Sequence, residues 1–375
     1  MEKLPLTFTD GRALRINCDK FKPIQEELEV FVRDTGILSS LEAIKDVMFS
    51  YELKNNNLVE GYTDDFSIID KVIKDKKYAT ADIEQIRRIS NLYQGYKYIL
   101  QGNAISPGTL QELYQILSKE LLPKSDVVRM GSHYRTAKGF ILHKGVLSGD
   151  LEETMEPELI ESFMEQYFNF LNNLDYSQSM TDEFIKSQIL HFYFVYIHPY
   201  FDVNGRTSRT LAMWYLLLKK AYPFIIFNRG IALCSNYDEA IIEAKRYHDI
   251  SYFIKYMLET VQAELEKEYI LQIVDELSSH PFSTLDYQTL QYVLTMNGII
   301  TAIDFATMYN RFNDKRKTED IYVSMLSPLI HDNVLQVVRT TNKNMFRGLP
   351  NEVLQINPTL MAYDRGRIRQ LKKFK

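Results

Sequence analysis

The stretch HPYFDVNGRTSR, residues 198–209, constrains this chain more than any other part of its sequence. It is flanked by two apolar runs, FYFVYI at 192–197 and TLAMWYLLLKK at 210–220, which are too long to be turns. The polar residues between them are therefore expected on a loop that joins two buried helices. The DVNG segment suits this place, because Asp, Asn and Gly tolerate the backbone of a tight connection.

The arginines of this stretch point to an anion. If the second run begins a helix, its first N–H groups face the loop at the positive end of the helix dipole. Arg206 and Arg209 are three residues apart and project from one face of the first turn. Cations at a helix N-terminus oppose the dipole, so an external anion explains their placement better than helix stability does. A polyphosphate fits that description.

Two more residues of the loop suggest chemistry. Asp202 supplies a hard oxygen ligand for Mg²⁺, with phosphate oxygens and waters completing the shell. His198 is suited to take a proton from an attacking hydroxyl. Residue types alone leave a purely structural interpretation equally open, because such arginines often pair with carboxylates and such histidines often pack in a core. The common GxxxxGK[ST] and HExxH motifs are absent from the sequence.

Composition narrows the class of protein. With 375 residues, 45% hydrophobic and 25% charged, the chain reads as ordinary globular material for two or three domains. A net charge of −5 gives no general reason to expect nucleic-acid binding. Cys18 and Cys234 match no disulfide or metal spacing, which favours a reducing, cytoplasmic location. The N-terminus does not read as a signal peptide, and lysines and a proline interrupt the most apolar segment, 214–227, so no membrane span is expected.

Periodicity predicts a mainly α-helical chain. The first twenty residues, with Asp10-Gly11 at the centre, predict a short β-hairpin, and residues 133–150 predict a second hairpin or flap. Ser106 before Pro107, and Glu156 before Pro157, are expected helix starts. Amphipathic spacing predicts helices within 23–34, 40–53, 64–75, 81–100, 106–121, 155–174 and 249–277.

The loop stretch resembles the signature of the Fic family. That signature is His-Pro-aromatic, a variable residue, Asp or Glu, Gly-Asn-Gly-Arg, two variable residues and Arg, and it aligns here with residues 198–209. The likeness extends from about residue 40 to 265, and 134–145 resembles the family's β-flap. The resemblance implies a Fic-fold helical bundle with a β-hairpin flap. It predicts an N-terminal helical region at 1–105 and a Fic core at 106–265.

Most Fic proteins are adenylyltransferases, so the resemblance implies transfer of AMP from ATP to a Ser, Thr or Tyr hydroxyl of a target protein. It makes His198 the general base and Asp202 the ligand of Mg²⁺ or Mn²⁺. The implied ATP-binding residues are Asn204, Gly205, Arg206 and Arg209, with Tyr237 beside the adenine. For Tyr237, a packing role on a helix is an equally open alternative. The flap, around 139–148, is expected to pin an extended target segment beside the base by strand addition.

The chain departs from the signature at two positions. Tyr200 replaces the usual phenylalanine and keeps the ring, whereas Val203 stands where glycine is usual. Because a β-branched residue is costly at positive φ, catalysis through this loop is expected to require an ordinary backbone conformation at Val203. The related Doc phosphotransferases carry lysine in place of the second glycine. This chain keeps Gly205, which favours AMP transfer.

Residues 55–62, NNNLVEGY, resemble the end of the inhibitory helix of many Fic proteins. Glu60 and Gly61 match its Glu-Gly end, and Asn56 takes the place of the usual Ser or Thr. The resemblance implies that Glu60 pairs with Arg209 and blocks the productive pose of ATP, so that the chain inhibits itself. The alternative is that Glu60 only caps a helix end.

The C-terminal third has a separate pattern. Three helical segments at 287–297, 300–310 and 318–333, and an alternating pair of strands at 334–349, resemble a winged helix over 282–352, followed by a basic tail at 353–375. Sequence-specific DNA binding is less favoured than protein interaction or a purely scaffolding role, because acidic residues stand at both ends of the third helix. A DNA-binding or protein-interaction regulator with an inactive Fic core is the alternative function, and a homo-oligomer is left open.

Overall fold

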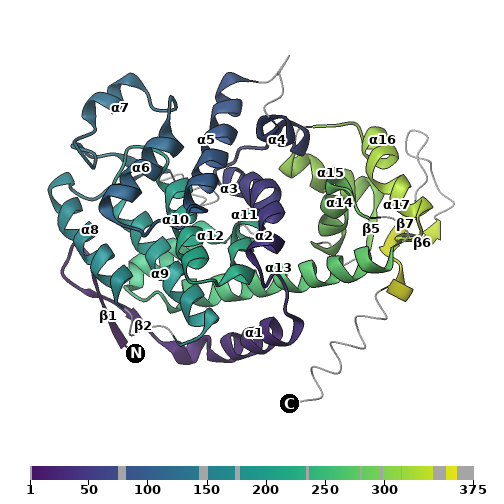
Figure 1. Cartoon of the computed structure of the whole chain (residues 1–375), viewed down its shortest axis with the longest axis horizontal. Helices are drawn as coiled ribbons and strands as arrows, with labels where there is room; N and C mark the ends of the chain where they lie inside the picture. The colour runs from purple at the N-terminus through teal and green to yellow at the C-terminus, as the bar shows by residue number, and fades with distance from the viewer. Residues whose placement is uncertain are drawn as a thin grey trace. The chain divides into compact units, whose positions relative to one another are not determined.

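The computed structural model describes residues 2–74, 82–142, 151–173, 178–233, 236–278, 281–295, 299–313, 315–340 and 352–360. These residues form a mainly helical protein with three small sheets, as the sequence predicts (Figure 1). The chain divides into two compact units, one of residues 1–62 and 67–264 and one of residues 63–66 and 265–375. The domain boundaries predicted from the resemblance stay a prediction.

The first unit begins with the predicted hairpin. Strands β1 (Glu2–Thr7) and β2 (Ala13–Ile16) pair antiparallel, and Gly11 in the turn adopts φ 79°. The backbone of β2 is also bonded to a later segment, since Arg15 N donates to His248 O and Ile250 N donates to Arg15 O, both at 2.9 Å. The hairpin is therefore fixed on two sides.

Helix α9 (Met180–Ile197) lies at the centre of the core, next to α10 (Asn204–Leu218) (Figure 1). Ser179 and Asp182 form a capping box at the start of α9. Side chains on every face of α9 are buried, polar ones such as Lys186 and Gln188 included, and its last six residues, 192–197, are the apolar run before the loop. The two apolar runs that flank the polar loop are thus the end of one buried helix and the body of the next, as predicted.

The predicted helices of this unit are present, and Ser106 and Pro157 start two of them as expected. The predicted helix at 40–53 contains a π-helical segment, Met48–Glu52, between α2 and α3. The other helices are α1 (Lys22–Thr35), α2 (Leu41–Val47), α3 (Leu53–Val59), α4 (Phe66–Ile73), α5 (Ile83–Ile99), α6 (Pro107–Ser118), α7 (Lys124–Arg129), α8 (Pro157–Asn172), α11 (Phe227–Leu233), α12 (Tyr237–Tyr247) and α13 (Ser251–Leu277), and short 3₁₀ helices occupy Cys18–Lys20 and Tyr222–Ile226.

The flap is present at its base. Strands β3 (Phe140–Leu142) and β4 (Leu151–Glu153) pair antiparallel, with Phe140 opposite Glu153. The rest of the predicted flap, residues 143–150, lies outside the described residues, as does Cys234. None of the described helices is both long and apolar enough to cross a membrane.

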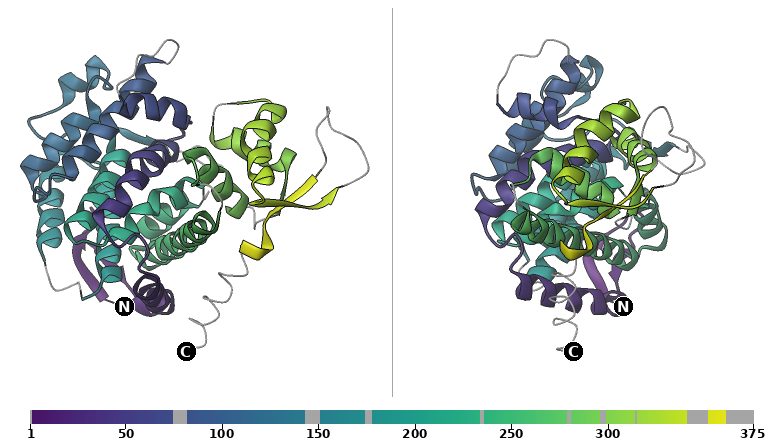
Figure 2. Two further views of the ribbon diagram at one scale, coloured as in Figure 1. Left: turned by 45° about the vertical axis from the view of Figure 1, so that its right-hand side comes forward. Right: turned by 90° about the vertical axis from the view of Figure 1, so that its right-hand side faces the viewer.

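The second unit carries the end of α13 and a helical group with a three-stranded antiparallel sheet in the order β5-β7-β6 (Figure 2). The strand that pairs with β6 is β7. It lies later in the sequence than the second strand predicted within 334–349, and it extends beyond 352, the predicted end of the winged helix. Residues 341–351 and 361–375 lie outside the described residues. The winged-helix assignment stays a prediction. The elements are α14 (Thr284–Thr295), β5 (Ile299–Thr301), α15 (Ala302–Phe312), α16 (Thr318–Ile321), a π-helical segment (Tyr322–Leu326), α17 (Ser327–His331), β6 (Leu335–Thr340) and β7 (Glu352–Ile356).

Candidate active site

The loop between α9 and α10 turns sharply at both ends. His198 ends α9 in the left-handed conformation, φ 51° and ψ 60°, and its N–H donates to Phe194 O at 3.0 Å. Val203 precedes α10 at φ 66° and ψ 10°. Val203 therefore does not have the ordinary backbone conformation that catalysis through this loop was expected to require. A left-handed β-branched residue costs roughly 1–3 kcal/mol, and the packing of this side chain, which is only 3% exposed, offsets that strain.

Asn204 braces the loop from within. Its Oδ1 accepts from Tyr200 N at 3.0 Å, and its Nδ2 donates to Tyr200 O at 2.8 Å. The Tyr200 ring in turn stacks on Tyr114 of α6, with centroids 3.5 Å apart and planes 8° from parallel. Tyr200 thus keeps the packing role of the usual aromatic residue. The predicted contact of Asn204 with phosphate stays a prediction, because its amide is turned toward Tyr200 here.

Arg135, which the sequence analysis missed, ties this loop to the base of the flap. The side chain is 2% exposed and donates to three carbonyl oxygens: His198 O at 2.8 Å, Ala137 O at 2.9 Å and Met155 O at 2.7 Å. Its backbone N–H also donates to Pro199 O at 3.0 Å. Ala137 precedes β3 and Met155 follows β4, so one guanidinium fixes both flap strands against the backbone of His198.

His198 is placed to act as a base. Its Nδ1 is buried and has no hydrogen-bond partner among the described residues, while part of the residue stays accessible. Burial, with smaller contributions from the charges of Lys245 and Arg135, lowers the pKa of His198 to about 3. The imidazole is therefore neutral at pH 7, the protonation state that a general base requires.

The N-terminus of α10 already holds a carboxylate. Glu60, at the end of α3, lies so close to Gly205 that a Cβ on that glycine would be 2.2 Å from Glu60 Oε1. The same Oε1 accepts from Arg209 Nη2 at 2.6 Å. The place where the sequence predicts an anion is thus occupied by a side chain of the chain itself.

Arg209 is held by a second residue of α3. Its Nε donates to Asn56 Oδ1 at 2.8 Å and its Nη2 donates to Asn56 O at 3.0 Å. Asn56 is fully buried, and its Nδ2 donates to Tyr96 Oη at 3.1 Å. The residue that replaces the usual Ser or Thr therefore supplies its own contact to Arg209.

Arg206 is in a different state from Arg209. Only 5% of it is exposed, its Nε has no hydrogen-bond partner, and no carboxylate lies within ion-pair distance of it among the residues described. Its guanidinium carbon lies 5.9 Å from the ring centre of Tyr62, on which the Arg88 guanidinium also stacks at 3.8 Å. A buried charge without a counter-charge is costly, so this arrangement favours binding of an external anion.

Asp202 fits a metal that shares substrate oxygens. The residue is exposed, and its Oδ1 accepts from Val203 N at 2.6 Å. Mg²⁺ is commonly held by one or two carboxylates with phosphates and waters. No cluster of three or more His, Cys, Asp or Glu is found among the described residues, so in that part of the chain the protein does not supply a full coordination shell.

Tyr237 is fixed by a buried histidine that sequence reasoning also missed. The hydroxyl lies 2.8 Å from His191 Nε2, and His191 Nδ1 lies 3.1 Å from Gln188 Oε1. Because the amide oxygen can only accept, Nδ1 carries the proton and Nε2 accepts from the tyrosine. Burial, followed by the charge of Arg209, lowers the pKa of His191 to about 3, so the ring is neutral. A role for Tyr237 beside adenine stays a prediction.

Comparison with known proteins agrees with this geometry. Residues 104–216 match the Fic/DOC family, and they include α6, the flap strands, α9, the polar loop and most of α10. The chain carries a Fic domain. Members of this family often transfer AMP or another nucleoside monophosphate.

Solved structures share the fold at low sequence identity. A Fic family protein from Desulfovibrio desulfuricans G20 is 14% identical with a TM-score of 0.54, and the match covers 90% of this chain and 94% of that one. A Fic domain-containing signaling protein from Bacteroides thetaiotaomicron VPI-5482 is 18% identical, with a TM-score of 0.50 and coverage of 66% and 97%. Fic-1 from C. elegans is 15% identical, with a TM-score of 0.51 and coverage of 67% and 72%.

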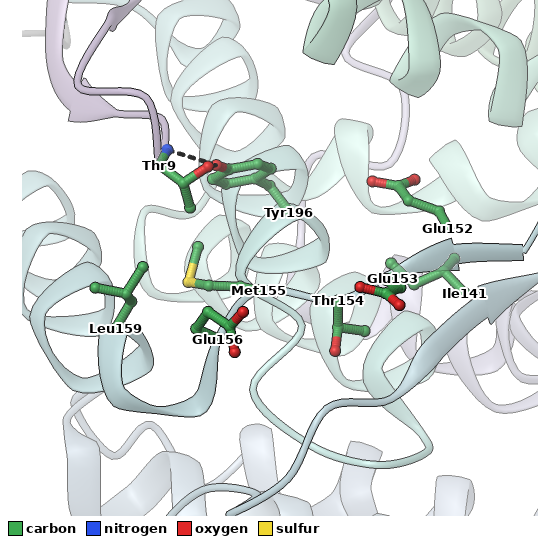
Figure 3. A pocket seen from close by; sticks show the side chains of 9 residues that line it. All are labelled: Thr9, Ile141, Glu152, Glu153, Thr154, Met155, Glu156, Leu159 and Tyr196. Carbon is green, nitrogen blue, oxygen red and sulfur yellow. Dashed lines mark hydrogen bonds between the residues drawn. The ribbon is translucent and has the colours of Figure 1, made fainter.

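A hollow of about 320 Å³ lies beside the flap of the Fic domain (Figure 3). The carboxyl side chains of Glu152, Glu153 and Glu156 line it together with Tyr196, whose hydroxyl accepts from Thr9 N at 2.8 Å. Lysines balance part of this charge, since Lys138 pairs with Glu153 and Glu156 and Lys245 pairs with Glu152. Tyr196 lies in the last turn of α9, the helix that ends at His198.

Proposed function

We propose that this Fic domain transfers AMP from ATP to a hydroxyl group of a target protein, and that Glu60 restrains the reaction. One observation carries the proposal: Arg206 is buried without a carboxylate partner among the described residues, beside a helix N-terminus that already attracts the carboxylate of Glu60. The site is therefore suited to an anion with several oxygens, next to the loop that bears His198.

In the proposed reaction, the neutral imidazole of His198 takes the proton of the acceptor hydroxyl. The acceptor oxygen then forms a bond to the α-phosphorus of ATP, the bond from that phosphorus to the β-phosphate oxygen breaks, and pyrophosphate leaves. Arg206, Arg209 and the N–H groups of the first turn of α10 hold the negative charge of the phosphates. The proton on His198 afterwards passes to solvent.

Asp202 is the residue that would hold Mg²⁺ or Mn²⁺, and the metal would offset the charge of the leaving pyrophosphate. The exposed carboxylate of Asp202 is oriented by the Val203 N–H. Arg135 keeps the backbone of His198 in register with the flap, where an extended target segment would add a strand. We place this activity in the cytoplasm, in keeping with the exposed thiol of Cys18, which forms no disulfide.

The restraint by Glu60 is part of the same proposal. Its carboxylate uses an Arg209 N–H and the space over Gly205, both of which a terminal phosphate would need. ATP would therefore bind in a pose unsuited to in-line attack as long as α3 stays in place. A substitution of Glu60 would remove this restraint and would leave the base, the metal ligand and Arg206 unchanged.

The position of the label in ATP tests the transfer. The purified chain, with Mg²⁺ and a cell lysate, is incubated in parallel with ATP labelled at the α-phosphate or at the γ-phosphate. AMP transfer predicts protein bands that carry the α-label, that are absent from the lysate alone and that the His198→Ala variant does not produce. A γ-label on protein above the level of the lysate alone would indicate phosphate transfer and overturn the proposal, as would equal α-labelling by His198→Ala.

The C-terminal unit keeps a second candidate open, a regulator that binds DNA or protein. Its helix-strand-helix-helix-strand-strand order supports this candidate, although Glu319 and Asp320 lie in the first turn of α16. Salt-dependent binding of duplex DNA by the full chain, together with no AMP transfer by the Glu60→Gly variant, would favour the regulator. Transfer by that variant would favour the enzyme.

A further inference from the structure

A second hollow, of about 650 Å³, lies between the N-terminal hairpin and the end of α12, and none of its lining residues belongs to the loop signature. Its basic lining residues are Lys3, Arg12, Arg15, Arg246 and His248. None of the lining residues is acidic, and the neighbouring Asp10 lies within ion-pair distance of Arg12 and His248. This concentration of positive charge contrasts with the net charge of −5 of the whole chain. The contrast calls for an explanation in terms of either structure or binding.

The hairpin places two of these cations directly opposite each other. Lys3 and Arg15 are partners in the antiparallel register of β1 and β2. Like charges in such a cross-strand pair are destabilising. No ion pair involves either residue in the described part of the chain, whereas Arg12 and Arg246 make exposed pairs with Asp10 and Glu243, at 3.5 Å and 3.0 Å. The hairpin thus carries a repulsion that a bound anion would offset.

The floor of this hollow is rigid. The backbone N–H of Arg15 donates to His248 O, and its backbone carbonyl accepts from Ile250 N. Its side-chain Nη2 donates to Tyr247 O at 2.7 Å. These bonds fix the direction of the guanidinium. They give Arg15 a structural role at the end of α12, but they do not explain why Lys3, Arg12 and Arg246 converge on the same hollow.

We propose that this hollow binds the polyphosphate group of a nucleotide, at a site separate from the one that contains Arg206. The guanidinium groups suit phosphate oxygens, and the Tyr247 ring, 56% exposed in the lining, offers a surface on which a base can stack. The volume lies in the range of small-molecule sites. The hollow lies at the far end of α12 from Tyr237, about 16 Å along an eleven-residue helix. The proposal does not depend on AMP transfer.

Calorimetric titration of the full chain with ADP and with pyrophosphate tests the site. The Lys3→Gln/Arg246→Gln variant removes two exposed charges, and we expect its affinity at this site to fall roughly tenfold or more. A control variant, Lys45→Gln/Lys97→Gln, makes the same charge change elsewhere and should bind as the parent does. The titrations are repeated in an Arg206→Ala background, which weakens the proposed active-site contact. In the parent background, where the active site also binds nucleotide, the same loss appears as weaker binding at one of the two ADP sites.

The Tyr247→Ala variant separates the contribution of the nucleotide base to the affinity from that of the phosphates. A nucleotide site predicts that this variant loses affinity for ADP and keeps its affinity for pyrophosphate. If ADP and pyrophosphate bind equally well and Tyr247→Ala changes neither, the nucleotide assignment is overturned. If Lys3→Gln/Arg246→Gln binds ADP as the parent does in both backgrounds, with an unchanged melting temperature, the site itself is overturned.

Discussion

Glu60 and Gly205 share one space at the start of α10. A Cβ on Gly205 would lie 2.2 Å from Glu60 Oε1, so only glycine at this position lets the carboxylate approach the helix N-terminus. The carboxylate also accepts from Arg209 at 2.6 Å. The second glycine of the signature therefore leaves room for an anion, and in this structure that anion is the carboxylate of Glu60, the residue that follows α3.

Removal of this carboxylate should release the enzyme. We expect Glu60→Gly to label itself with α-labelled ATP at least about tenfold faster than the parent, because a charge-assisted contact of roughly 1.5–3 kcal/mol no longer competes with the phosphate. Glu60→Gln, which keeps the size and loses the charge, should fall between the two. Arg209→Ala should lower labelling in either background. Equal labelling by parent and Glu60→Gly, with Glu60→Gly/His198→Ala inert, would show that Glu60 is not the restraint.

Arg135 should act on turnover through the backbone of His198. Lysine cannot donate to His198, Ala137 and Met155 together, so in the Glu60→Gly background Arg135→Lys should lower kcat about tenfold or more with little change in the KM for ATP. The exposed Arg129→Lys is the matched control. A purely structural role would instead lower the melting temperature and leave the kcat of the folded protein unchanged, and that result would refute the positioning role.

Metal dependence should follow Asp202. We expect activity of Glu60→Gly to vanish in excess chelator and to return with Mg²⁺ or Mn²⁺. Asp202→Asn keeps an oxygen but loses the charge, so it should need more metal for half-maximal activity, and Asp202→Ala should lose most turnover. Because Asp202 is exposed, neither change should shift the melting temperature appreciably. Full turnover by Asp202→Ala at low Mg²⁺ would remove this residue from the metal site.

The loop and its flanking helices could be predicted because the residues that define them are consecutive in the sequence. A polar run between two apolar runs indicates two buried helices and the turn that joins them. Arg135 and His191 were not, since their partners are separated from them by tens of residues, as in the bonds to His198 O and Tyr237. Arg135 moreover binds backbone carbonyls, which leave no trace in residue types.

Val203 shows the opposite error, in which a local rule gave the wrong answer. A β-branched residue alone avoids positive φ, but burial of this side chain offsets the strain, and burial depends on the whole fold. The π-helical segment before α3 has the same character, because residues 40–53 have the periodicity of an uninterrupted helix. Element types were thus readable from the chain, and conformations set by tertiary packing were not.

Stability should depend on pH through a buried carboxyl group, Glu52, in the π-helical segment before α3. Burial, opposed by the charge of Arg229, raises the pKa of Glu52 from 4.5 to about 8. Between these values the folded state binds a proton that the unfolded state lacks. The free energy of unfolding should therefore fall as pH rises through this window, by up to about 1.4 kcal/mol per unit.

His191 acts in the other direction and at lower pH. Its pKa falls from 6.5 to about 3 on folding, so between these values the unfolded state binds the extra proton and stability falls as pH drops. Above pH 6.5, Glu52 is the member of this pair that changes the free energy of unfolding with pH. We therefore expect the melting temperature of the parent to decline from pH 6.5 to 8, and Glu52→Gln to abolish most of that decline. Unfolding scans of both proteins in matched buffers measure it, and an identical slope in Glu52→Gln would mean that Glu52 is ionised in the folded chain.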